Sequence, residues 1–392
     1  MRRPARLGEI PGFGIDEVAE AAGDDPEVLR LENLDTDLPV PDGVVEATRR
    51  AVGVDEYNSY VPFDGRADLK AAVAAHFERR SGVAIDSSQI TITGGDGDGL
   101  NNALNATTDV GDGVIVTDPT YAGIVNRVHL AGGVPRFAPF RVVDGEWRLD
   151  RDVLVAAVGP ATRAMLLMSP SMPSGGWFDE QDWRLICDLC CEHELGLIYD
   201  SAMERLLFDG RPLHHPLRFE GMVERTLVVG SLSKEHRMIG WRVGWVAGPP
   251  ATIEDVGWVH VYNTTMPTGL SRTAAAVVLR GDQGHVQECV EELERRRDLL
   301  LSALPGWPFV RPAGGWSMLL DVASLGFEPA EASRLLLEES AIAATGMTGW
   351  GGEVAGRHVR FVYSAEPATL LETIPERLAG TKLADAVAGP AE

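Results

Sequence analysis

Six short apolar runs punctuate the chain, and their positions do not alternate between apolar and polar. A strand of this kind is buried on both faces, as in a mostly parallel sheet that is covered by helices. We therefore predict strands at Gln89–Thr93, Gly113–Thr117, Arg163–Met168, Leu195–Tyr199, Arg225–Val229 and Arg242–Ala247.

The segments between these runs have helical patterns. They predict helices at Gly99–Thr108, Tyr121–Ala131 and Glu180–Glu194. Strands that alternate with helices indicate an α/β fold, here a large domain with a mostly parallel sheet and helices on both of its faces.

Chemically unusual residues follow the first five predicted strands. These segments read "TGGDGDG", "DPTY", "SPSMPSGG", "DSAMERLLFDG" and "GSLSKEH". Ligands of open α/β sheets bind outside the carboxyl ends of the strands. The sequence therefore predicts one site that is built from successive strand ends.

The length of 392 residues is sufficient for two domains. We expect the large domain at residues 60–280, and a smaller α+β domain from the N-terminal segment 1–59 and the C-terminal part 281–392. A charged helical pattern at residues 286–304 predicts the long connector between the domains. The glycine-rich stretch 346–356, "GMTGWGGEVAG", favours a flexible loop that closes over a ligand.

Composition narrows the classes of partner. With 45% hydrophobic and 24% charged residues, the chain has the composition of an ordinary globular protein. Its formal net charge of -23 argues against nucleic acid or an anionic membrane as the main partner. Three arginines near the start precede no apolar segment, and no run of about eighteen apolar residues follows, so we expect a cytoplasmic protein.

Three of the four cysteines lie close together in a predicted helix. They are Cys187, Cys190 and Cys191, in the segment "CDLCCEHE". A zinc site would need further ligands at matching spacing, and the sequence offers none. We expect reduced, half-buried thiols and no metal.

The segment "TGGDGDGLNNAL" is a glycine-rich turn that leads into a helix. Exposed backbone N–H groups and the helix dipole at such a turn favour a phosphate. The turn lacks the lysine of a P-loop, and its glycine spacing fails the dinucleotide fingerprint, so alone it is a weak signal. Beside Ser231, Ser233 and Arg242 it becomes one side of a phosphate cup.

A single lysine stands at the centre of the segment "VVGSLSKEHRMIGWRVGW". Lys234 follows Ser231 and Ser233 at a strand end, and Arg242 comes eight residues later. This arrangement of hydroxyl and cationic groups is suited to an anionic ligand.

Asp200 and Tyr121 each allow two interpretations. Asp200 follows a buried strand, where it either caps a helix or holds the protonated ring nitrogen of a bound cofactor. Tyr121 either packs in the core or stacks on the same ring.

Together these segments resemble the class I/II aminotransferases of the aspartate aminotransferase superfamily, which are fold type I pyridoxal-phosphate enzymes. The resemblance covers nearly the whole chain. It rests on "DLPVPDGVVEA", "YVPFDGRADLKAAV", "TGGDGDGLNNAL", "DPTY", "RAMLLMSPSMPSGG", "LGLIYD", "VVGSLSKEHRMIGWRVGW" and "RHVRFVYS". The pattern of serine, lysine and arginine around Lys234 is the most specific of these.

The resemblance implies a role for individual residues. Lys234 matches the lysine that forms a Schiff base with pyridoxal 5'-phosphate and later moves a proton, and Asp200 matches the partner of the ring nitrogen. Tyr60 matches a tyrosine that reaches the phosphate of the neighbouring subunit, which implies a homodimer with shared active sites. The cofactor phosphate is expected to contact the backbone of Gly95, Asp96 and Gly97 and the side chains of Ser231, Ser233 and Arg242.

Arg360, in "HVRFVYS", matches the arginine that binds the α-carboxylate of the substrate. A guanidinium binds a carboxylate through two hydrogen bonds, and this orients the reacting carbon. Without the resemblance, an arginine on a late strand is more simply a surface ion pair.

The chain departs from the family pattern at four positions. Met172 and Met203 replace an asparagine and a tyrosine that donate hydrogen bonds to the phenolic oxygen of the cofactor, and a thioether cannot donate. Asp96 replaces a small residue beside the phosphate, so we expect its side chain to turn away. Leu34 stands where a glycine usually lines the substrate pocket.

These features favour transamination of an amino acid or a similar metabolite. Elimination, cyclisation or oxidative deamination in specialised metabolism stays open, because one fold hosts many chemistries. A relative that binds the cofactor without turnover is a further alternative. Trp316 and Trp350 favour a bulky or apolar substrate side chain, whereas Arg66 and Arg127 are interpreted as solvated surface residues.

Overall fold

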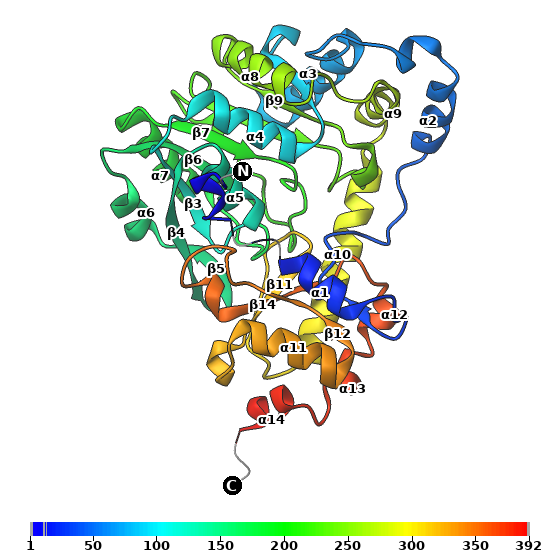
Figure 1. The fold of residues 1–392 in the computed structure, drawn as a ribbon, viewed down its shortest axis with the longest axis vertical. Coiled ribbons are helices and arrows are strands. Elements are labelled where there is room, and N and C mark those ends of the chain that lie inside the picture. The colour runs from blue at the N-terminus through cyan, green and yellow to red at the C-terminus, as the bar shows by residue number, and fades with distance from the viewer. Residues whose placement is uncertain (1–2, 11, 13, 390–392) are drawn as a thin grey trace.

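An eight-stranded sheet forms the centre of the large domain in the computed structural model, which describes residues 3–10, 12 and 14–389 (Figure 1). The strand order is β2-β9-β8-β7-β6-β3-β4-β5. Strands β8, β7, β6, β3 and β4 run parallel, whereas β9 is antiparallel to both of its neighbours and β5 is antiparallel to β4. The strands span Ile90–Thr93 (β2), Gly113–Asp118 (β3), Val134–Val143 (β4), Glu146–Leu149 (β5), Thr162–Met168 (β6), Gly196–Asp200 (β7), Thr226–Ser231 (β8) and Gly244–Ala247 (β9). The predicted α/β fold with a mostly parallel sheet is confirmed.

Both faces of this sheet are covered, because successive side chains of each strand are apolar and point to opposite sides. On one face, Val114, Leu166 and Val229 pack against helices α4 (Asp96–Thr107), α5 (Ala122–Leu130) and α8 (Pro250–Asn263). On the other face, Ile115 and Met165 belong to a core that includes α3 (Ala67–Ser81) and α7 (Glu180–Glu192).

The prediction for the last strand of this sheet was wrong at its start. The sequence predicts a strand from Arg242, but the chain forms a 3-10 turn at Ile239–Trp241, and β9 begins at Gly244. Arg242 itself has a left-handed backbone with φ of 51°, which ends the turn. Strands β4 and β5 were missed, because prolines at 135 and 139 interrupt the apolar pattern of β4.

A second, smaller body lies below the large sheet in Figure 1. Its antiparallel sheet has the order β10-β11-β14-β13, with strands at Phe309–Val310 (β10), Ser317–Asp321 (β11), Thr345–Gly346 (β13) and His358–Val362 (β14). The N-terminal strand β1 (Leu29–Arg30) pairs with β12 (Ile342–Ala343), so both ends of the chain contribute to this body.

Helix α10 (Gly284–Ala303) runs from the large body into the small one, near the predicted connector (Figure 1). Helix α1 (Gly14–Ala22) lies at the junction between the two bodies. The remaining helices are α2 (Val44–Val52), α6 (Arg151–Ala157), α9 (Gly269–Arg280), α11 (Pro329–Ser340), α12 (Ala368–Leu371), α13 (Ile374–Leu378) and α14 (Lys382–Ala388).

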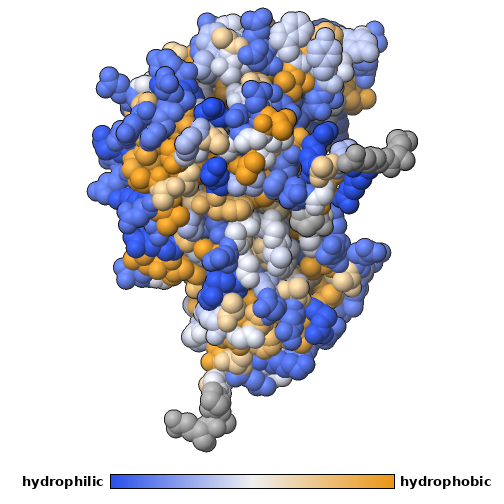
Figure 2. Space-filling model, turned by 60° about the vertical axis from the view of Figure 1, so that its left-hand side comes forward, coloured by the Kyte–Doolittle hydropathy of each residue, from blue (hydrophilic) through white to orange (hydrophobic). Residues whose placement is uncertain are grey.

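The surface agrees with the charged composition. Figure 2 shows one face on which hydrophilic residues predominate and hydrophobic residues lie scattered between them. Among the described residues, no helix combines the length and the apolar character needed to cross a membrane.

The start of β9 lies against the glycine-rich turn before α4. A Cβ atom at Gly244 would lie 2.6 Å from the carbonyl carbon of Gly95 and 2.9 Å from the amide nitrogen of Asp96. These are backbone atoms, which cannot move aside as a side chain can. Glycine at position 244 therefore lets the strand and the turn approach each other.

We expect Gly244→Ala to lower the free energy of unfolding by about 1–3 kcal/mol, since the added methyl group overpacks this contact. Chemical denaturation of the cofactor-free protein measures the effect. Gly240→Ala is the matched control, because a Cβ atom at Gly240 meets no heavy atom within 4 Å. Equal stability of the two variants would contradict the argument.

Candidate active site

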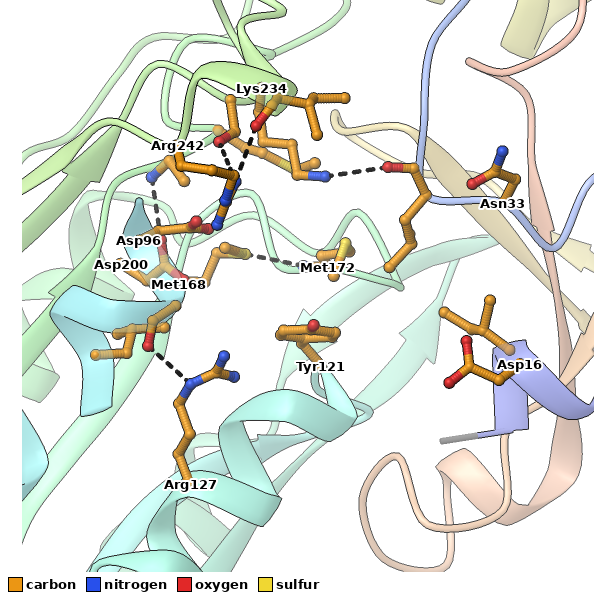
Figure 3. Close-up of a pocket in the computed structure, with 18 residues that line it drawn as sticks. Asp16, Asn33, Asp96, Tyr121, Arg127, Met168, Met172, Asp200, Lys234 and Arg242 are labelled. Atoms are coloured by element: carbon orange, nitrogen blue, oxygen red, sulfur yellow. Dashed lines mark hydrogen bonds between the residues drawn. The ribbon is translucent and has the colours of Figure 1, made fainter. Parts of the chain in front are cut away.

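A cavity of about 370 Å³ opens at the carboxyl ends of the central strands (Figure 3). The residues that line it come from several strand ends, from α1 and from the segment after β1. Those that the sequence predicted are Leu34, Asp96, Gly97, Tyr121, Met172, Asp200, Met203, Ser233, Lys234 and Arg242. Residues far apart in the sequence thus form one site.

Lys234 extends into this cavity from the loop after β8. Its Nζ donates a hydrogen bond to the carbonyl oxygen of Leu34 at 3.4 Å, and it lies 4.3 Å from the ring centroid of Trp316. Burial lowers the pKa of the amine below its usual value, although the carboxylates of Asp96 and Asp35 act in the opposite direction. The amine is therefore easier to deprotonate than a surface lysine.

The glycine-rich turn and the N-terminus of α4 form one wall of the cavity. Gly95 has φ of +98°, and a Cβ atom there would lie 2.6 Å from Nη2 of Arg242. A Cβ atom at Gly97 would lie equally close to Nη2 of Arg127. Glycine at these two positions lets the guanidinium groups lie against the turn, and the positive φ of Gly95 also favours glycine. The backbone N–H groups at the N-terminus of the helix favour an anion nearby.

Hydroxyl groups complete the wall on the β8 side. Ser231 and Ser233 are buried, and Ser231 Oγ accepts a hydrogen bond from the amide of Ser233. Arg242 donates to Ser233 Oγ at 3.3 Å and to the carbonyl of Ile239 at 3.0 Å, which fixes its guanidinium. The left-handed backbone of Arg242 turns its side chain toward this wall.

Asp98 holds the glycine turn in place, a function that the sequence analysis did not assign. Its carboxylate accepts hydrogen bonds from the amide of Gly94 at 2.8 Å, from Asn102 at 3.0 Å and from Thr264 at 3.0 Å. These bonds tie α4 to the end of α8. An acidic residue in the first turn of a helix is the signal that predicts such a cap.

Asp200 is the last residue of β7 and is almost fully buried. Burial, reinforced by the nearby charge of Asp96, raises its pKa to about 8. Its Oδ1 accepts a hydrogen bond from the amide of Ala202 at 3.1 Å. A buried carboxyl group of this kind is stabilised in its ionised form by a cationic ligand group.

Arg360 on β14 is fully buried beside the cavity. Its Nη2 donates to the carbonyl of Glu32 at 2.6 Å, and its Cζ lies 4.5 Å from the centroid of the Trp350 ring. Its Nε and Nη1 have no hydrogen-bond partner among the described residues, and burial lowers its pKa to about 9. Nε and Nη1 are therefore buried donors without a partner in the described part of the chain, and Arg360 lies behind the residues that line the cavity.

The glycine-rich segment 346–356 is anchored, whereas the sequence favoured a flexible loop. Asp118, the last residue of β3, accepts hydrogen bonds from the amides of Val354 at 3.0 Å and Ala355 at 2.9 Å. Gly351 and Gly352 are needed because a Cβ atom at either position would lie within 3.0 Å of the Asp118 carboxylate. The glycines serve a tight contact here. This contact places Trp350 between Tyr121 and Arg360.

The comparisons with known proteins agree with this geometry. The sequence model described as "Aminotransferase class I and II" matches residues 27–375. The chain belongs to the class I and II aminotransferases.

Named relatives in this family have different substrates. An arginine–pyruvate transaminase of Pseudomonas aeruginosa is 31% identical over 349 residues, which are 87% of each chain. An aromatic-amino-acid aminotransferase of Thermococcus litoralis is 30% identical over 358 residues, 90% of each chain. The crystal structure of the Rhizobium meliloti aspartate aminotransferase superposes with a TM-score of 0.89 at 28% identity, covering 97% of this chain and 99% of that one.

The chain is thus a pyridoxal-phosphate-dependent aminotransferase of fold type I. The cavity has a chemically suitable group for each part of the cofactor. Arg242, the buried serines and the N-terminus of α4 suit its phosphate, the Asp200 carboxyl suits its ring nitrogen, and the Lys234 amine suits its carbonyl carbon.

Two sequence interpretations of charged residues near the cofactor were wrong. Asp96 lines the cavity of this aminotransferase, and its charge acts on Lys234 and Asp200, whereas we expected its side chain to turn away. Arg127 also lines the cavity, and it donates to the carbonyls of Gly97 at 2.9 Å and Gly123 at 2.7 Å.

Arg66, by contrast, lies outside the cavity and pairs with Glu56 and Asp68. Arg127 is different because Gly97 and Gly123 provide the space that its guanidinium occupies. Glycines in the first turns of two neighbouring helices are the sequence signal for this contact.

Tyr121 is the N-cap of α5 and lines the cavity, where its ring packs against Trp350 at 5.8 Å between centroids. Trp316 and Trp350 are both buried beneath the cations Lys234 and Arg360. Tyr60 does not line the cavity of its own chain, and its side chain is 78% exposed.

The cysteines lie apart from the aminotransferase site. Cys187 and Cys190 are buried and Cys191 is half-buried, and burial raises the pKa of Cys190 to about 12. Within the residues that the structure describes, no three His, Cys, Asp or Glu side chains are arranged to hold a metal ion.

Three thioethers line one side of the cavity. Met168, Met172 and Met203 are all buried, and the Met168 sulfur accepts a hydrogen bond from the amide of Met172 at 3.3 Å. A thioether sulfur carries no hydrogen, so none of the three can donate a hydrogen bond to an anionic oxygen.

We expect Met203→Tyr to lower the pH midpoint of the absorbance change of the bound cofactor by about one unit. A tyrosine hydroxyl at this position would stabilise negative charge on the phenolic oxygen, and a charge-assisted hydrogen bond of about 1.5 kcal/mol corresponds to about one pKa unit. The stabilised form is the deprotonated one, so the midpoint moves down.

Spectral titration of wild type and variant measures the midpoint. Met203→Leu is the control, because leucine changes the shape of the side chain without adding a donor. An unchanged or higher midpoint in Met203→Tyr would mean that another donor already serves the oxygen.

Proposed function

We propose that this aminotransferase removes the amino group of an amino acid in the cavity around Lys234, with the α-carboxylate of the substrate held by Arg360. The observation that carries the proposal is a buried guanidinium with two nitrogen atoms that lack a hydrogen-bond partner among the described residues, close enough to the half-buried Lys234 amine to affect its pKa. A carboxylate that accepts a hydrogen bond from one of these nitrogens would offset part of the desolvation of Arg360.

In this proposal Lys234 moves the proton. Its lowered pKa makes the neutral amine easier to form than in a solvent-exposed lysine, and a neutral amine can accept a proton from the α-carbon of the substrate. The bound pyridoxal phosphate supplies the electron sink for this chemistry. Asp200 stabilises a positive charge on the ring nitrogen, and Tyr121 covers one face of the ring.

The phosphate site consists of the backbone of Gly95, Asp96 and Gly97 with Ser231, Ser233 and Arg242. The rigid hydrogen bonds of Arg242 and the N-terminus of α4 support this assignment. Leu34 and Trp316 border the substrate, since both contact the Lys234 amine.

Transamination is favoured over elimination, cyclisation or oxidative deamination, because the named relatives are aminotransferases. A relative without turnover is disfavoured, because Lys234, Asp200 and Arg360 are all present. We also propose a cytoplasmic location and the division into segments 1–59, 60–280 and 281–392.

A homodimer is part of the proposal. Tyr60 is supported as a ligand of the neighbouring phosphate by its exposure and by its distance from its own cavity. Other exposed aromatic side chains in the large domain, Phe63, Trp258 and Tyr262, are suited to an interface.

We expect Lys234→Ala to lose covalent attachment of the cofactor and to lower the rate of amino transfer by roughly 10²–10⁴-fold. Borohydride reduction followed by mass spectrometry of the intact protein tests the attachment. The chain has only two other lysines, Lys70 and Lys382, so the controls Lys70→Ala and Lys382→Ala cover the alternatives. A covalent adduct in Lys234→Ala would refute the assignment.

We expect Tyr60→Phe to weaken pyridoxal phosphate binding by about 1 kcal/mol, or roughly fivefold in Kd, because one hydrogen bond is lost. Equilibrium dialysis of the cofactor measures this change, and sedimentation shows whether the dimer persists. Tyr262→Phe is the control, since it removes another exposed hydroxyl. A fully active monomer would contradict the proposal of shared sites.

A further inference from the structure

The first turn of α1 brings an acidic side chain to the cavity. Ile15 is buried in the core of the large domain, and this contact directs the adjacent Asp16 to the cavity, which it lines. Figure 3 shows Asp16 on the other side of Tyr121 from Asp96 and Arg242, with its carboxylate toward the cavity. Asp16 has no hydrogen bond or ion pair with another described residue.

This turn lies close to the proposed carboxylate site. A Cβ atom at Gly14 would contact Cγ2 of Thr345 at 3.9 Å, and Thr345 Oγ1 lies 3.4 Å from Nη2 of Arg360. Arg360 is fully buried and has two unpartnered N–H groups. A substrate whose α-carboxylate binds Arg360 would therefore extend its side chain into the cavity that Asp16 lines.

The charges of the cavity are unevenly distributed. Its cations, Arg127, Lys234 and Arg242, come from α5 and from the loop between β8 and β9. The opposite side, from α1 and the segment after β1, contributes Ile15, Asp16, Asn33 and Leu34, none of which is a cation. A side-chain carboxylate would meet the negative charge of Asp16 there, whereas an ammonium or guanidinium group would be attracted.

The apolar residues on this side match the remainder of such a side chain. Ile15 and Leu34 provide apolar surface next to Asp16 and Asn33. A basic amino acid has the same order of groups, with an aliphatic stem that ends in a cationic head. The Asn33 amide oxygen can accept a further hydrogen bond from that head.

We propose that the amino donor of this enzyme is a basic amino acid, and that Asp16 binds its side-chain cation. This inference rests on the proposed function. Asp16 is also an acidic residue in the first turn of a helix, a position that is favourable by itself. Glu17 lies in the same turn but does not line the cavity. A substitution of Glu17 therefore tests the effect of the helix position without affecting substrate binding.

The test compares L-arginine with L-citrulline, which has nearly the same shape but no side-chain charge. The cofactor-loaded dimer is mixed with each amino acid, and the conversion of the cofactor is followed by absorbance. We expect wild type to have a lower KM for arginine. Asp16→Asn is expected to raise KM for arginine about tenfold with kcat nearly unchanged, and to change KM for citrulline less than twofold.

Two further variants control for structure and charge. Glu17→Gln is expected to leave both KM values unchanged, and Asp16→Glu is expected to retain the preference for arginine. Added salt tests wild type directly, since screening should raise KM for arginine more than KM for citrulline. This measurement decides the question even if Asp16→Asn fails to fold.

The results separate this inference from the proposed function. Equal use of arginine and citrulline by wild type, a preference for L-glutamate, or an equal effect of salt on both donors would overturn the role of Asp16 while amino transfer stands. Failure of every amino acid to convert the cofactor would instead overturn the proposed function.

Discussion

Desolvation of charged groups is the constraint on which this site depends. Asp200 and Arg360 are buried and Lys234 is half-buried. Burial raises the pKa of Asp200 and lowers the pKa of Lys234 and of Arg360, so it favours the neutral form of each group. Burial of a charge without an ion partner is costly, so the fold must supply compensating stability elsewhere. It does so with the two apolar cores on either face of the large sheet. The site therefore favours ligands whose charged groups can pair with these side chains.

The central architecture could be predicted because its signals are local. Unbroken apolar runs identify strands that are buried on both faces, and five of the six predicted strands begin within one residue of the observed start. The position of Lys234 at the end of β8 and of Asp200 at the end of β7 follows from the same rule, since parallel strands place their carboxyl ends together.

Other features depend on contacts between distant segments, which no local pattern reveals. The start of β9 was misjudged because Arg242 adopts a left-handed backbone, which a non-glycine residue rarely does. Arg127 was taken for a surface residue because the space it fills is created by glycines in two different helices. Asp96 was misplaced because no local pattern shows that the N-terminus of α4 faces the cavity. For Arg127, the partner Gly97 lies 30 positions away in the sequence.

The hydrogen bonds between Asp118 and the segment before β14 connect the two bodies of the molecule. Asp118 ends a strand of the large sheet, whereas Val354 and Ala355 precede the strand that carries Arg360. The guanidinium is therefore positioned by the large sheet as well as by its own. In chimeras between family members, this aspartate and the glycine-rich segment should therefore be exchanged together, although Asp118 and Val354 lie 236 positions apart in the chain. A graft that takes the C-terminal part alone would leave the carboxylate facing a foreign loop.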